Sequence, residues 1–374
     1  MILLFADTRV IVAGSNSSLK SQGGVSAFTS DLISFLIRQN ENLALIGNFK
    51  AEKTNFAQTY FFKSRSNSIF LIKLTLYFFL HRFSKSDVYY FQRPDHILTS
   101  CFRKGRKILH LHGNQRENIK SRKALPIQLI YNLIEYFGLK VAEVVVVTDK
   151  ITASEYVRHY PFLANKLHII PTGINLTDFQ PNELKEAVAS NNDKIISYIG
   201  RLEYPKRISE IIYAFSIATS KDPLLKLYIA GEGNQLNSLI SKVEVLQIKD
   251  KVFFTGLLTK SEVYNLINKS LAGILLSYSE GSPVSVKEFL ACGKPVIVNN
   301  VGDVADYIID GKTGQIVDPE LPENIANAIL DITKNSDLLT ENCLQIATQY
   351  DNNFLFETIY AHLLDKICPF ENIN

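Results

Sequence analysis

The feature that most restricts the fold of this 374-residue chain is a repeated alternation of short apolar runs with longer amphipathic stretches. The short β-branched and aliphatic runs predict strands buried on both faces, and the longer stretches predict helices that cover them. Strands that alternate with helices in this way form parallel sheets. The predicted strands are residues 2–5, 43–46, 88–91, 108–111, 144–147, 195–199, 227–230, 252–254, 273–276 and 295–298. The predicted helices include residues 26–39, 208–220, 262–268 and 284–292.

The pattern starts twice, at the N-terminus and again near residue 195, which predicts two doubly wound α/β lobes. The expected boundary is the Pro-, Gly- and Asn-containing stretch at residues 169–185. Ligands of such sheets bind beyond the carboxyl ends of the strands, so both lobes are expected to face one central cleft. The predicted parts are an N-terminal lobe of residues 1–175, a C-terminal lobe of residues 176–352 and a C-terminal helix in residues 353–374 that packs back on the first lobe.

Composition excludes several classes of protein. Hydrophobic residues make up 46% and charged residues 21%, an ordinary globular balance. No run of 18 or more apolar residues occurs, and the apolar start lacks the basic leader of a signal peptide. The four cysteines are far apart without a CxxC pair, which indicates a reducing compartment and argues against structural zinc. We therefore expect a cytoplasmic protein.

Charge is distributed unevenly between the two halves. Residues 1–180 carry 23 Lys and Arg against 12 Asp and Glu, a net charge of +11, whereas residues 181–374 carry a net charge of −8. This asymmetry indicates different partners for the two halves, with an anionic surface or substrate for the first. Drift in surface charge between two domains is the alternative.

The most informative stretch is residues 277–300, SYSEGSPVSVKEFLACGKPVIVNN. Ser282 is a suitable N-cap and Pro283 a suitable first helical residue, and Gly293 should end the helix after Cys292. The amino end of that helix would favour an anion such as a diphosphate. Glu280 stands before the helix and Glu288 lies inside it, a spacing that suits a sugar and a ribose of one extended ligand.

This stretch resembles the E-x7-E segment of retaining GT-B glycosyltransferases of the family-4 type. Seven residues separate Glu280 from Glu288, and Gly-Lys-Pro-Val closes the segment. The resemblance implies that Glu280 orients the donor sugar and Glu288 holds the ribose. It also implies that Ser282, Pro283 and Val284 belong to the donor site, where amides near Pro283 and Val284 contact sugar hydroxyls. A surface helix with two ordinary glutamates is the alternative.

A second signature begins the C-terminal lobe, where a predicted strand ends at Gly200 and is followed by Arg201 and Lys206. Two cations between a strand end and a helix amino terminus can neutralise a diphosphate. The stretch resembles the G-R-L-x-x-x-K segment of the same family, which implies that both side chains stabilise the departing nucleoside diphosphate. Solvated surface cations are the alternative.

Two departures from the family pattern follow the helix, because Asp303 and Asp306 stand where a second glycine and a glutamate are usual. The interlobe stretch also resembles that of the family, with Thr172 in place of the usual Asn. Because of these departures, the resemblance does not predict the contacts that this stretch makes beyond the donor sugar.

The N-terminal lobe offers a glycine pair and a histidine. Gly23 and Gly24 lie between a predicted strand and a helix, where glycine lets the backbone approach a bound group. The resemblance implies contact with the donor diphosphate and the acceptor, although a plain flexible loop fits as well. His112 ends a predicted strand, and the family often has a histidine near the donor sugar at this place. A histidine that caps a turn is the alternative.

No D-x-D sequence occurs in the chain, so we expect no metal and no other cofactor. Arg201, Lys206 and the helix dipole would supply the electrostatic stabilisation.

The resemblance implies transfer of a sugar from a UDP- or GDP-sugar to an acceptor hydroxyl, with retention of configuration. The catalytic candidates are Glu280, His112, Arg201 and Lys206. A glycan or lipid-linked acceptor in cell-surface polysaccharide, lipopolysaccharide or lipid-linked glycan synthesis is expected. A nucleotide-sugar 2-epimerase and a non-catalytic nucleotide-sugar-binding subunit are the alternatives.

Residues 61–85 interleave five Lys and Arg with Phe, Leu and Ile. The apolar part, residues 69–80, is too short to span a bilayer but suits a helix lying in the interface. We therefore expect peripheral binding to an anionic membrane surface, with a buried helix and solvated basic flanks as the alternative. Nucleic acid is not expected, because no recognition motif is present.

Overall fold

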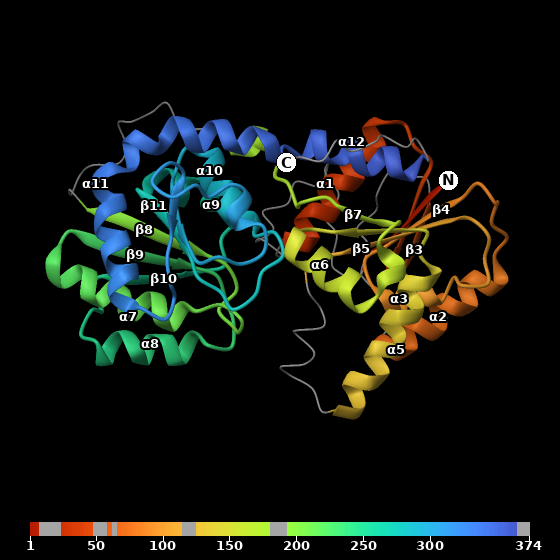
Figure 1. Cartoon of the computed structure of the whole chain (residues 1–374), viewed down its shortest axis with the longest axis horizontal. Coiled ribbons are helices and arrows are strands. Elements are labelled where there is room, and N and C mark those ends of the chain that lie inside the picture. Colours follow the sequence, from red (N-terminus) through yellow and green to blue (C-terminus); the bar gives the residue numbers. More distant parts are fainter. Residues whose placement is uncertain (7–23, 48–57, 62–65, 114–124, 180–192, 365–374) are drawn as a thin grey trace. The chain divides into compact units, whose positions relative to one another are not determined.

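A computed structural model describes residues 1–6, 24–47, 58–61, 66–113, 125–179 and 193–364. The described residues form two compact units, which divide between Thr172 and Gly173 and again between Asp351 and Asn352. The first unit contains both ends of the described chain, and the second is the continuous stretch between them (Figure 1). No helix within the described ranges has the length and hydropathy that crossing a membrane requires.

The first unit is built on a seven-stranded sheet in the order β3-β2-β1-β4-β5-β6-β7, and every neighbouring pair is parallel. The short buried runs predicted from the sequence form its central strands. The strands are β1 (Ile2–Ala6), β2 (Leu43–Gly47), β3 (Gln58–Phe61), β4 (Val88–Phe91), β5 (Arg106–Leu111), β6 (Val144–Val147) and β7 (Leu167–Ile169).

Side chains alternate across this sheet, as a strand requires, and each face has its own core. Val88 and Tyr90 of β4 pack on one side with α1 and α12, while Tyr89 and Phe91 pack on the other with α2, α3, α5 and α6. The helices are α1 (Gly24–Arg38), α2 (Asn67–Leu80), α3 (Pro94–Leu98), α5 (Leu125–Val141), α6 (Lys150–His159) and α12 (Asn352–Leu363).

The C-terminal helix α12 packs on α1, although more than 300 residues of chain separate the two. The Phe356 ring lies 5.3 Å from that of Phe28 and 5.7 Å from that of Phe35. The Tyr360 hydroxyl donates to Glu41 Oε1 at 2.5 Å. The last described helix is therefore part of the first unit.

The second unit contains a six-stranded parallel sheet in the order β10-β9-β8-β11-β12-β13. Its strands are β8 (Lys194–Ile199), β9 (Leu225–Ala230), β10 (Val252–Gly256), β11 (Ala272–Leu275), β12 (Val296–Val298) and β13 (Gly314–Ile316). Its helices are α7 (Ile208–Lys221), α8 (Leu236–Val245), α9 (Lys260–Lys269), α10 (Val284–Ala291) and α11 (Pro322–Ala347).

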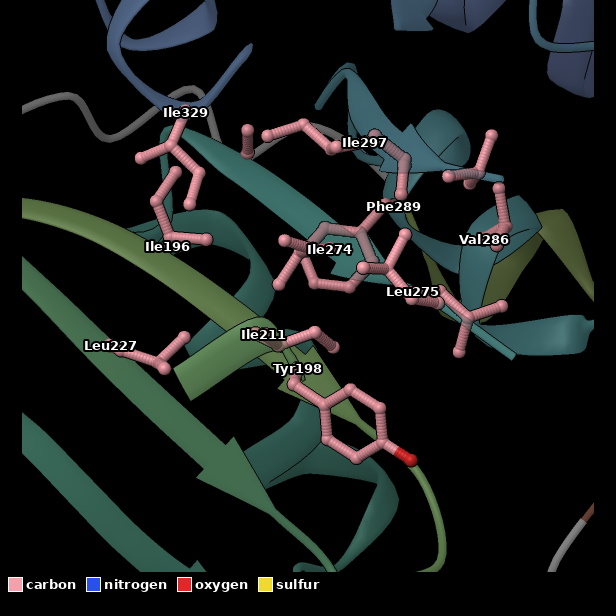
Figure 2. Packing of buried hydrophobic residues seen from close by; sticks show 14 of the residues in the cluster. Ile196, Tyr198, Ile211, Leu227, Ile274, Leu275, Val286, Phe289, Ile297 and Ile329 are labelled. Carbon is pink, nitrogen blue, oxygen red and sulfur yellow. The ribbon is translucent and has the colours of Figure 1, made fainter. Parts of the chain in front are cut away.

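Helix α7 contacts α8 and α11, and α9 contacts α10. Figure 2 shows part of the core between sheet and helices, where Ile211 of α7, Ile329 of α11 and Phe289 of α10 gather around the strand residues. A Cβ atom on Gly273 of β11 would lie 2.7 Å from the Phe289 ring, so glycine is needed there for α10 to pack closely.

All ten predicted strands are present, and the described residues contain three further strands that were not predicted: β3, β7 and β13. Each missed strand is short and lies at an edge of its sheet. An edge strand pairs on one side only, so its apolar run is weaker, as the partly exposed Leu167 and Ile316 illustrate.

Candidate active site

The candidate site in the second unit lies where the strand order reverses. Strands β8 and β11 are neighbours in the sheet although two strands separate them in sequence. The loops that follow them therefore leave in different directions, which creates the switch point where α/β sheets bind ligands. Arg201 and Lys206 follow β8, and Glu280 and Ser282 follow β11.

Backbone hydrogen bonds tie these two loops together. Lys206 and Ser277 form an antiparallel bridge. The Arg207 amide donates to the Leu276 carbonyl at 3.0 Å, and the Tyr278 amide donates to the Pro205 carbonyl at 3.0 Å. The loops after β8 and β11 are therefore held in one fixed arrangement.

That arrangement places Lys206 and Glu280 in contact. Lys206 Nζ donates to Glu280 Oε1, and the two side chains are only 13% and 12% exposed. An ion pair shielded from water interacts more strongly than a surface pair. The structure thus joins two residues that are 74 positions apart, an ammonium suited to phosphate and a carboxylate suited to hydroxyl groups.

Arg201 and Glu288 are less enclosed. The Arg201 guanidinium pairs with Glu203 and its side chain is 65% exposed. The Arg201 carbonyl accepts from the Tyr198 hydroxyl at 3.0 Å, which holds the backbone of the loop. Glu288 is half-buried on α10. Their donor contacts remain predictions.

Glycines allow the loops at this edge to pack against one another. Gly231, after β9, has φ +138°, and a Cβ atom there would lie 1.9 Å from the Gly200 carbonyl oxygen. Gly302 has φ +58°, and a Cβ atom there would lie 2.2 Å from the Gly281 carbonyl oxygen. A side chain at either position would push away a loop that carries predicted site residues.

Beneath the Glu280 loop lies a buried ion pair that was not predicted from the sequence. Lys287 of α10 and Asp303 are 0% and 2% exposed, and Lys287 Nζ lies 2.8 Å from Asp303 Oδ2. Lys287 Nζ also donates to Ser282 Oγ, which in turn donates to Asp303 Oδ2. The Tyr307 hydroxyl donates to Asp303 Oδ1 at 2.7 Å.

This network fixes the turn between Glu280 and α10. The Asp303 amide donates to the Gly281 carbonyl at 2.9 Å, so Asp303 holds the turn through both its backbone and its carboxylate. A sequence signal for the pair existed, since Lys287 lies three and four positions before the apolar Leu290 and Ala291 and so shares their buried face.

The predicted N-cap of α10 was wrong by one residue. Helix α10 begins at Val284 with buried Pro283 as its N-cap, and the Ser282 hydroxyl bonds to Asp303 instead. The buried carboxylate of Asp303 competes for the hydroxyl that the helix start would otherwise take. Because Pro283 has no N–H, backbone donors from this turn must come from its neighbours.

In the first unit, His112 directly follows β5. Its ring stacks on that of His110 with centroids 4.3 Å apart, and the Phe28 ring packs edge-on against both. His110 Nδ1 is hydrogen bonded to the Tyr90 hydroxyl. The Nε2 atoms of both histidines are buried without a hydrogen-bond partner among the described residues.

Burial lowers the pKa of His112 to about 4 and the pKa of His110 well below its usual range. Both rings are therefore neutral near pH 7. A neutral imidazole can donate one hydrogen bond to a substrate hydroxyl or accept one from it. Gly24 is the first residue of α1, and Gly23 lies outside the described residues.

Residues 179–349 match the protein family described as "Glycosyl transferases group 1". They make up most of the second unit, including the loops with Lys206 and Glu280. The second unit therefore resembles the group 1 glycosyltransferases in sequence.

Curated relatives show the same likeness. Alpha-monoglucosyldiacylglycerol synthase of Streptococcus pneumoniae is 29% identical over 195 residues, which cover 48% of this chain and 44% of that protein. N,N'-diacetylbacillosaminyl-diphospho-undecaprenol alpha-1,3-N-acetylgalactosaminyltransferase of Campylobacter jejuni is 26% identical over 66% of each chain. The match thus spans less than half the length of the first relative.

Two solved structures resemble the whole chain. Sucrose-phosphate synthase from Thermosynechococcus elongatus has a TM-score of 0.78 at 18% identity, covering 98% of this chain and 99% of that one. HepE from Anabaena, in complex with UDP-glucose, has a TM-score of 0.77 at 16% identity, covering 97% and 99%. The predicted two-lobe GT-B fold is confirmed.

Proposed function

We propose that this protein is a retaining glycosyltransferase that moves a sugar from a nucleoside diphosphate sugar to a hydroxyl of a glycan or lipid-linked acceptor. The single observation that supports it most is the shielded Lys206–Glu280 pair, which lies at the switch point of a sheet whose sequence matches the group 1 family. An enclosed ammonium beside a carboxylate suits a ligand that combines phosphate with hydroxyl groups.

In the proposed reaction, the bond between the anomeric carbon and the diphosphate oxygen breaks as a bond to the acceptor oxygen forms on the same face. The acceptor proton passes to an oxygen of the leaving phosphate. Lys206 and Arg201 stabilise the negative charge that develops on the diphosphate. Glu280 orients the sugar, Glu288 holds the ribose, and neutral His112 contacts a sugar hydroxyl.

The names of the relatives support the acceptor class. One is a glucosyldiacylglycerol synthase and another acts on a diphospho-undecaprenol. For this chain we propose a lipid-linked or glycan acceptor in bacterial polysaccharide or glycolipid synthesis. We also propose that the protein is cytoplasmic and peripheral on the inner face of the membrane, which the +11 charge of residues 1–180 supports.

A thermal-shift screen with UDP, GDP and their sugars tests the donor class. A ligand present at about 100 times its Kd should stabilise the native state by about 2.7 kcal/mol and raise the Tm. Slow donor hydrolysis or transfer with retained configuration, followed by NMR, then separates a transferase from a binding subunit. Release of an epimer without acceptor would instead show a 2-epimerase.

A further inference from the structure

Two histidines of the first unit lie on the same side of β5. His110 belongs to the strand and His112 follows two positions later, so their side chains share one face of the sheet. The two rings stack with centroids 4.3 Å apart and an angle of 21° between their planes. In the proposed function only His112 contacts the donor, so His110 has no assigned role.

Ring contacts, and not a hydrogen bond at Nε2, hold the His112 side chain. Its Nε2 atom is buried without a hydrogen-bond partner in the part of the chain that the structure describes. The ring stacks on that of His110 and meets the Phe28 ring at 5.0 Å with an angle of 69°. A histidine ring is only weakly restricted in its rotation about χ2 by its own chain. The orientation of His112 therefore depends on the rings that pack against it.

His110 is held more firmly than His112. Its side chain is fully buried, and its Nδ1 atom lies 2.5 Å from the Tyr90 hydroxyl oxygen. Tyr90 belongs to the neighbouring strand β4 and pairs with Ile108, so it lies on the same face of the sheet as His110. The Phe28 ring packs edge-on against His110 at 5.1 Å. A ring held by a hydrogen bond and an aromatic contact gives His112 a fixed surface on which to stack.

The hydrogen bond between Tyr90 and His110 also determines which ring nitrogen carries the proton. Burial raises the pKa of Tyr90 well above its usual range and lowers that of His110 well below, so both groups are neutral. If Tyr90 donates to Nδ1, the ring proton is on Nε2, and this N–H alone lacks a partner among the described residues. The reverse arrangement would leave both the tyrosine hydrogen and the Nε2 lone pair without partners. Because unpaired buried groups are costly, His110 carries its proton on Nε2.

We propose that His110 is a positioning residue for His112. The Tyr90 hydroxyl holds the His110 ring, and the stacked His110 ring holds His112 in the orientation in which it contacts a hydroxyl of the donor sugar. The inference rests on the proposed function, because the contact with the sugar is part of that function. The stacking itself requires neither donor nor acceptor, so it can be measured on the protein alone.

NMR spectroscopy of the histidine-labelled full chain without ligands tests this arrangement directly. The ring nitrogen chemical shifts should show the proton of His110 on Nε2, and spectra of His110→Leu and His112→Ala assign the signals. Tyr90→Phe should shift the signals of both rings, because the ring on which His112 stacks is no longer fixed. Unchanged His112 signals in the folded Tyr90→Phe protein would overturn the proposal.

Transfer kinetics test the consequence for the reaction. Tyr90→Phe should lower kcat roughly fivefold, which is the effect of losing one hydrogen bond. His110→Leu should lower kcat about tenfold, because the stacked ring is lost as well and a misplaced contact group loses much of its effect. His110→Phe should recover part of this loss, since a flat ring again faces His112. The Kd for free UDP or GDP, whichever stabilises the protein, should not change, because His112 contacts the sugar.

A double-mutant cycle separates positioning from a general structural role. In the His112→Ala background, His110→Leu should lower kcat by less than about twofold, because the residue through which it acts is absent. A loss as large as in the wild-type background would overturn the proposal. The matched control is Tyr156→Phe, which removes a buried tyrosine hydrogen bond to Glu135 on the other face of the same sheet. It should leave kcat and the signals of both histidines unchanged.

Failure of the proposed function would be visible separately. If His112→Ala itself transferred sugar at the wild-type rate, the role of His112 in the reaction would be wrong. The Tyr90→Phe spectra would still decide whether His110 holds the His112 ring, and the Tm of each variant reports on folding.

Discussion

The two units have the same parallel-sheet architecture but differ in how their functional residues are held. In the second unit the loops at the switch point are bonded to each other, and a buried Lys287–Asp303 pair supports them. In the first unit the conspicuous features are two stacked histidines and the exposed apolar side chains of α2 and of α5. A small polar ligand requires a rigid set of charges, whereas a membrane or a large acceptor requires accessible surface. Substitutions in each unit, a change of pH and metal removal can test whether the two units differ in this way.

The largest effect should come from breaking the buried pair. Lys287→Met leaves the Asp303 carboxylate buried without its cation, which should destabilise the second unit by about 3–5 kcal/mol. Lys287→Met/Asp303→Asn removes both charges and should recover much of that loss. Urea denaturation measures the free energy of unfolding of both variants. If Lys287→Met were as stable as the wild type, the Lys287–Asp303 pair would not support the loop that carries Glu280.

Lys206→Ala removes the ammonium group and should reduce the rate of sugar transfer by at least roughly 100-fold, as removal of one preorganised charge partner does in other enzymes. Arg201→Ala should have a similar effect. The exposed Lys249→Ala serves as the control, and the Tm of each variant reports on folding. Near wild-type turnover in both folded variants would contradict the phosphate assignment.

Glu280 and Glu288 should contact different parts of the donor. Glu280→Gln should lower turnover by roughly tenfold or more through a lost hydrogen bond to a charged group, while the Kd for the free nucleoside diphosphate hardly changes. Glu288→Gln should weaken nucleotide binding more than turnover. Calorimetric titration and initial rates distinguish the two, and equal loss of diphosphate affinity would remove Glu280 from the sugar subsite.

Histidine titration should destabilise the first unit alone, because none of the seven histidines lies between residues 173 and 351. Burial lowers the pKa of His112 to about 4, and burial with neighbouring cations lowers that of His362 to about 4. The unfolded chain therefore binds protons that the folded chain does not. The free energy of unfolding should fall as the pH drops from about 6.5 toward 4.

Hydrogen exchange at pH 7.5 and 5.5 can follow each unit separately. Peptides from the first unit should lose protection at the lower pH, and His112→Asn should lessen that loss. The opposite pattern, with exchange rising first in the second unit, would contradict the assignment.

The smallest effect should be that of metal removal. Because the chain has no D-x-D sequence, excess EDTA should leave transfer largely intact. Abolition by EDTA with rescue by Mn²⁺ or Mg²⁺ would overturn the account in which Arg201 and Lys206 carry the electrostatic stabilisation.

Local patterns were sufficient for most of the secondary structure. The run Val144–Val147 and the segment Val88–Phe91 were predicted with their observed bounds, because strands buried on both faces have a continuous apolar signal. The end of α10 before Gly293 was also predicted, since glycine adopts the φ of +71° found there without strain. The E-x7-E and G-R-L-x-x-x-K segments gave the resemblance to group 1 glycosyltransferases, which residues 179–349 match.

Contacts between distant residues could only come from the folded chain. The sequence does not reveal that Glu280 faces Lys206 or that Asp303 takes the hydroxyl of Ser282, because both contacts join loops that only the folded sheet brings together. The exposure of the apolar side chains on α2 was likewise undetermined, since an apolar helix can be buried on all sides or on one. Local periodicity and turn residues determine which segments become strands and helices. Only tertiary packing determines which side chains meet and which remain exposed, because burial is a property of the whole fold.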